Sequence, residues 1–117
     1  MRSDRDRLRD ILQALAKIET QVPRGEDVFC RDEMLQVWMV HHLEIIGEAA
    51  RALSPAFRAR YPQVQWAKLI AMRNILVHEY FGLNLRQVWV VATRDLPVLK
   101  CHIQQIVQTP GGETEEK

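Results

Sequence analysis

Apolar residues recur every three or four positions along most of this chain, and this period constrains the fold more than any other feature. Near the N-terminus the series consists of Leu8, Ile11, Leu12, Leu15 and Ile18. Such spacing places apolar side chains on one side of an α-helix, which must then be buried against a neighbour. A chain of 117 residues can bury one core. The pattern therefore predicts an all-α domain, an antiparallel bundle of about four to five helices.

Capping residues and prolines indicate where these helices begin and end. The first helix starts at residue 4, after Ser3, and must end before Pro23, which opens an expected loop over residues 22–27. Asp32 or a neighbour caps a second helix of roughly 20 residues, whose apolar side includes His42.

The second half of the chain predicts further helices. Ser54 is a cap followed by proline, so a short helical turn is expected there. A third helix is expected over residues 64–80, and Asn84 can cap a fourth helix. The three tryptophans, Trp38, Trp66 and Trp89, are assigned to the core. Pro97 indicates a kink or a new start within that last segment. We expect residues 1–108 to form the domain and residues 109–117 a flexible acidic tail.

Charge is nearly balanced overall but unevenly distributed. A formal net charge of +1 argues against non-specific coating of nucleic acid. However, no acidic residue lies between Glu48 and Glu79, and this window holds five cations: Arg51, Arg58, Arg60, Lys68 and Arg73. They form either a local positive field or ordinary solvated helix faces. The N-terminus lacks a signal-peptide pattern and no apolar run is long enough to span a bilayer, so a cytoplasmic location is expected.

Reactive side chains gather at the end of the third predicted helix, in Arg73, Asn74, His78 and Tyr80. Arginine pairs with phosphate through a forked set of donors, and histidine can transfer a proton near neutral pH. On a regular helix His78 points about 140° away from Arg73. Convergence of the two groups therefore requires a distorted last turn, the long reach of arginine, or a second subunit, and we favour the last two.

The flanking residues strengthen this interpretation. The runs 43–50, 61–62, 72–74, 76–82, 88–89 and 95–97, together with Trp66, resemble the HepT-like branch of the HEPN superfamily, with Arg73, His78 and Tyr80 at the positions of its arginine, histidine and tyrosine. Ala71 departs from the glycine expected before Met-Arg-Asn.

The resemblance implies a homodimeric, metal-independent ribonuclease toxin that uses no cofactor. Its implied partner is an MNT-type nucleotidyltransferase antitoxin that adds AMP to the motif tyrosine, Tyr80. In this interpretation Arg73 and His78 are catalytic toward RNA and Asn74 orients the imidazole. Products would then carry a 2′,3′-cyclic phosphate.

Other interpretations stay open. Arg73 and His78 could simply complement the dipole at a helix C-terminus. His41 and His42 beside Glu44 and Glu48 could suggest a metal site, although pairing of the two glutamates with basic groups at a subunit or antitoxin interface is favoured. In the alternative function, the same cleft binds a nucleotide or RNA without cleaving it, and the protein is the helical partner of a nucleotidyltransferase.

Overall fold

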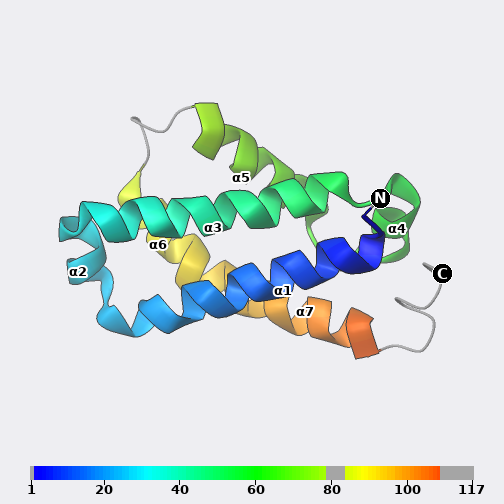
Figure 1. Ribbon diagram of the computed structural model, residues 1–117, viewed down its shortest axis with the longest axis horizontal. Coiled ribbons are helices and arrows are strands. Elements are labelled where there is room, and N and C mark those ends of the chain that lie inside the picture. The colour runs from blue at the N-terminus through cyan, green and yellow to red at the C-terminus, as the bar shows by residue number, and fades with distance from the viewer. Residues whose placement is uncertain (1, 79–83, 109–117) are drawn as a thin grey trace.

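The computed structural model describes residues 2–78 and 84–108, and helices dominate this part of the chain. Helix α1 (Asp4–Gln21) runs antiparallel to α3 (Glu33–Ala52), and the two lie side by side along the length of the molecule (Figure 1). The predicted all-α class is confirmed. No strand occurs in either described range.

Two further long helices complete the arrangement. Helix α5 (Trp66–His78) packs against α3, whereas α7 (Leu96–Gln108) packs against α1 (Figure 1). The contacts therefore follow the order α5, α3, α1, α7. The third helix begins at Trp66 rather than at the predicted residue 64, because the residues after Tyr61 form a turn.

The expected loop over residues 22–27 was wrong. The chain instead forms η1 (Val22–Arg24), a 3₁₀ turn, and then α2 (Glu26–Arg31). Proline is tolerated in a first helical turn, where its missing N–H would have no partner. Gly25 has φ +94° and changes the direction of the chain between the two turns. Helix α2 is stabilised by Phe29, whose side chain is in the core and has no exposed surface.

The predicted caps are confirmed. In each case the side-chain oxygen accepts a hydrogen bond from the backbone N–H three residues later, at 3.1–3.2 Å; the caps are Ser3 for α1, Asp32 for α3, Ser54 for α4 (Pro55–Arg60) and Asn84 for α6 (Leu85–Val90). These bonds satisfy donors that lack an intrahelical partner.

The predicted interruption near Pro97 is also confirmed. A π-helical segment, η3 (Val91–Asp95), separates α6 from α7, and Pro97 lies in the first turn of α7. The wider π turn accommodates the change of register at this point.

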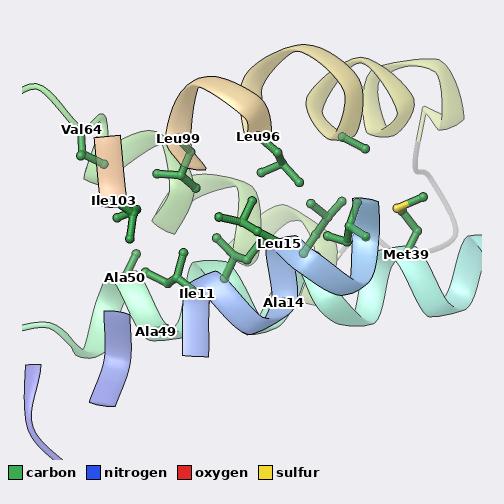
Figure 2. Packing of buried hydrophobic residues seen from close by; sticks show 14 of the residues in the cluster. Ile11, Ala14, Leu15, Met39, Ala49, Ala50, Val64, Leu96, Leu99 and Ile103 are labelled. Atoms are coloured by element: carbon green, nitrogen blue, oxygen red, sulfur yellow. The ribbon is translucent and has the colours of Figure 1, made fainter. Parts of the chain in front are cut away.

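The core lies where α1, α3 and α7 meet. Figure 2 shows Ile11 and Leu15 from α1, Met39 from α3, and Ile103 from α7 among the side chains that fill this space. All four are almost completely buried. Of the tryptophans, Trp66 is buried, and Trp38 and Trp89 pack half-buried against the core, as predicted. Within the described residues, no helix combines the length and the apolar character needed to cross a membrane.

Candidate active site on helix α5

Helix α5 carries the motif and lies close to α3 at Gly47. A Cβ atom added at Gly47 would lie 2.3 Å from Cβ of Arg73 and 2.8 Å from the carbonyl oxygen of Leu69. Neither atom is the free end of a flexible side chain. The absence of a side chain at Gly47 therefore permits the helix contact, and this contact places the base of Arg73 against α3.

Arg73 is held by two neighbours. Its Nε lies 3.2 Å from Oε1 of Glu48, and its Nη1 donates a 3.0 Å hydrogen bond to Oδ1 of Asn74. Only 27% of the side chain is exposed. The guanidinium therefore has a defined orientation along the α3–α5 contact, at the edge of the protein surface.

Glu48 is shared between two arginines. Besides Arg73, it accepts hydrogen bonds from Nη2 and Nε of Arg51, at 2.8 and 3.2 Å. The Arg51 hydrogen bonds, followed by the positive charges of Arg51 and Arg73, hold the pKa of the Glu48 carboxyl below its ordinary value. The carboxylate is therefore ionised near neutral pH.

Of the two glutamates predicted at an interface, Glu48 thus finds basic partners within its own chain. Glu44 lies one turn earlier on α3 and is half-buried. An interface role for either residue stays a prediction.

The other motif residues are less constrained. Asn74 and His78 are both exposed on α5, four positions apart and therefore neighbours on the helix surface. Among the hydrogen bonds and ion pairs of the described residues, none joins His78 to Arg73 or to Asn74. The orienting role of Asn74 and the catalytic roles of Arg73 and His78 stay predictions. Tyr80 lies outside the described residues.

A groove of about 910 Å³ separates α5 from α6, η3 and α7. We call it the α5–α7 groove; its apolar lining includes Leu69, Met72, Ile75, Val88 and Val98. Ile75 and Val98 remain 51% and 56% exposed. This leaves apolar surface uncovered beside the motif.

Sequence reasoning missed this surface. Val77 is 44% exposed, whereas its neighbour Leu76 is buried. The reason is that α5 packs mainly on α3, so only one of its apolar sides is covered. The available signal was the distribution of apolar residues around the whole of α5, which is typical of a helix with more than one partner.

Packing explains His42 of α3, whereas His41 is exposed. His42 is 5% exposed and makes an edge contact with Trp38, with ring centroids 4.3 Å apart. Burial, followed by the positive charges of His41 and Lys17, lowers the pKa of His42. No group of three or more potential metal ligands occurs in the described ranges.

Ala71, where a glycine was expected, is exposed on α5. Its methyl group therefore does not enter the contact with α3.

Known proteins are similar to this chain over most of its length. A family model described as Ribonuclease HepT-like matches residues 11–106. "Probable ribonuclease HepT" of Thermococcus cleftensis is 36% identical over 107 residues, which are 90% of this chain and 96% of that protein. "Putative RNase TTE0752" of Caldanaerobacter subterraneus subsp. tengcongensis is 35% identical over 112 residues, covering 92% of this chain and 97% of the relative. None of the solved structures matches the chain.

The matched segment begins in α1 and ends in α7, so it includes the α3–α5 contact and the described part of the motif. It extends the resemblance noted in the motif to nearly the whole domain. The chain belongs to the HepT-like ribonuclease family.

Proposed function

We propose that this protein is a metal-independent ribonuclease, the toxin of a toxin–antitoxin pair. The observation that carries the proposal is the family match over residues 11–106, which includes Arg73, Asn74 and His78 on one helix. The names of the relatives support the ribonuclease class. The held guanidinium of Arg73 supports a role in phosphate chemistry, because arginine pairs with phosphate through forked donors.

In the proposed reaction the ribose 2′-oxygen attacks the adjacent phosphorus while the bond from phosphorus to the 5′-oxygen breaks. His78 takes the proton from the 2′-hydroxyl or supplies one to the departing 5′-oxygen. Arg73 stabilises the additional negative charge on the phosphoryl oxygens in the transition state. The products are a 2′,3′-cyclic phosphate and a free 5′-hydroxyl.

A second copy of the chain would complete this site. Arg73 is held toward α3, and His78 lies about 140° further around the helix, so one chain does not direct both groups to one point. Exposed apolar side chains flank the motif, namely Ile75 and Val77 on α5. We therefore propose a symmetric homodimer that covers these side chains and pairs Arg73 of one protomer with His78 of the other.

Control of the activity is proposed to act through Tyr80. An MNT-type nucleotidyltransferase antitoxin would transfer AMP from ATP to the phenolic oxygen and release pyrophosphate. The added nucleotide is a bulky anion close in sequence to Arg73. It would compete with RNA phosphate for the guanidinium and for space.

One observation favours the alternative, a nucleotide- or RNA-binding partner of a nucleotidyltransferase without activity of its own. The charge of Arg73 is already paired with Glu48, and Nη1 is engaged by Asn74. A guanidinium in this state can bind a phosphate through its remaining donors without any chemistry at His78.

Cleavage of RNA in the presence of EDTA separates the two functions. We expect the purified protein to cleave and to leave 2′,3′-cyclic phosphate ends, and His78→Ala to be inactive with an unchanged unfolding midpoint. His41→Ala is the matched control, since His41 is an exposed histidine outside the motif. RNA that is bound but not cut by the unmodified protein would favour the non-catalytic function.

Mixing two inactive variants tests the shared site. Arg73→Ala and His78→Ala protomers should regain about a quarter of the wild-type rate, because half of randomly formed dimers are mixed and each has one intact composite site. No recovery from dimers that exchange protomers would refute the pairing of Arg73 and His78 across the interface.

Tyr80→Phe should no longer incorporate AMP from the antitoxin, and labelling of that variant would place the modification elsewhere.

A further inference from the structure

A second hollow lies on the other side of α5, between this helix and α4. It has a volume of about 620 Å³. We call it the α4–α5 hollow; its apolar wall includes Pro55, Ala59, Ala67 and Ile70, and Asn74 belongs to its lining. Asn74 also accepts a hydrogen bond from Arg73, so the hollow adjoins the proposed active site.

Among the described residues that line this hollow, Arg58 is the one that carries a charge. Its Nε is buried, and among the described residues this nitrogen has no hydrogen-bond partner. A buried N–H without a partner costs roughly 1–3 kcal/mol. A phosphate in the hollow would pair with the terminal nitrogens of the same guanidinium, for which no partner occurs among the described residues.

The neighbouring arginines are in a different state. Arg51 and Arg73 share the carboxylate of Glu48, and Arg60 lies 5.3 Å from the ring centre of Tyr61. Within residues 2–78 and 84–108 no ion pair involves Arg58, and the sequence has no acidic residue between Glu48 and Glu79. The guanidinium of Arg58 therefore lines the hollow without a directly bound carboxylate among the described residues.

We propose that the α4–α5 hollow binds a nucleotide of the RNA chain next to the cleaved linkage, with its phosphate on Arg58. This inference rests on the ribonuclease function proposed above. The fork of guanidinium donors suits a phosphate, and the apolar wall formed by Pro55, Ala59 and Ile70 can contact a ribose or a base. Arg58 thereby adds affinity for RNA on the α4 side of the motif, while Arg73 acts on the reacting phosphate.

Binding of a fluorescent single-stranded RNA by His78→Ala protein tests the proposal without cleavage. Adding Arg58→Ala should weaken binding about tenfold and reduce the salt dependence of binding by about one phosphate contact. Arg58→Lys should restore part of the affinity, because the charge returns without the fork. Arg94→Ala is the matched control, since Arg94 is exposed and lines neither the hollow nor the α5–α7 groove.

Ala67→Phe provides an independent test that keeps every charge. Ala67 is exposed in the hollow, so a benzyl group should fill this space and weaken RNA binding without moving the unfolding midpoint. In the active protein Arg58→Ala should raise KM about tenfold and leave kcat within about twofold, as expected for an interaction made equally in the ground state and the transition state.

The outcomes separate this inference from the proposed function. If the wild-type protein cleaves RNA but folded Arg58→Ala and Ala67→Phe variants bind RNA as tightly as Arg94→Ala, the hollow is not a nucleotide site. If the wild-type protein does not cleave RNA but both variants lose binding, the ribonuclease proposal fails and the nucleotide site stands.

Discussion

Replacing Gly47 by alanine should loosen α5 and disturb the motif with a single methyl group. The added Cβ would lie 2.3 Å from Cβ of Arg73, whereas carbon atoms in contact are normally about 3.5–4.0 Å apart. The second close atom, the carbonyl oxygen of Leu69 at 2.8 Å, belongs to the backbone. Side-chain rotation relieves neither contact, so α5 must move away from α3 by at least about 1 Å.

Two opposing terms set the expected magnitude. Overpacking of this kind costs about 3 kcal/mol, the upper end of the usual range, because fixed atoms are involved. Alanine in place of glycine inside a helix raises the free energy of unfolding by about 1 kcal/mol. The net loss should be about 2 kcal/mol, which corresponds to a fall in Tm of roughly 10 °C for a domain of this size.

Urea and thermal unfolding measure this loss, and the cleavage assay measures its effect on the site. Displacement of α5 should lengthen the contact between Arg73 and Glu48 and lower the rate of RNA cleavage. The control is Gly25→Ala, where no atom lies within 4 Å of the added Cβ but φ is +94°. That variant should lose about 1 kcal/mol from backbone strain and cleave RNA normally. A Gly47→Ala protein as stable as the wild type would refute the close contact and the placement of Arg73 that depends on it.

Three further perturbations test other contacts. Ser54→Ala should reduce the free energy of unfolding by about 1–2 kcal/mol in urea titrations, because Ser54 caps α4 and donates a 2.7 Å hydrogen bond to Asp4; Ser54→Thr should keep most of this stability. Burial lowers the pKa of His42, so its neutral form stabilises the fold above pH 6.5, and this stability is lost as the pH falls through the depressed pKa. The free energy of unfolding should therefore fall between about pH 7.5 and about pH 5, and it should fall less in His42→Phe than in the wild type. Glu48→Gln should change stability by less than about 1 kcal/mol, as for other partly exposed ion pairs, yet reduce kcat about tenfold as Arg73 loses its orientation.

Cap chemistry made most helix starts predictable. Ser3, Asp32, Ser54 and Asn84 act on donors only three residues away, so their effect depends little on the rest of the fold. The helical turn α2 was missed because its reason is tertiary. Nothing local indicates that Phe29 reaches the core, and the proline and glycine nearby are typical of a loop.

The candidate site was only partly accessible from the sequence. Arg73, Asn74 and His78 could be placed on one helix by their spacing, but the partner of Arg73 depends on how α3 and α5 align. Gly47 carried a usable signal, because glycine inside a helix is unfavourable unless another chain segment comes close. Apolar residues all around α5 indicate more than one partner for this helix, but they do not show that the side with Ile75 and Val77 is the exposed one.

The distribution of charge around α5 suggests that binding and reaction depend on different arginines. Glu48 compensates Arg73 and fixes its direction, which reduces its attraction for distant phosphates but favours a defined contact with the reacting one. Arg58 has no such partner among the described residues, so its charge remains available to attract RNA. Removal of an interaction made only in the transition state lowers kcat, whereas removal of one made equally in the ground state and the transition state raises KM. Arg73→Ala should therefore act mainly on kcat and Arg58→Ala mainly on KM, and equal effects of both variants on kcat would contradict this division.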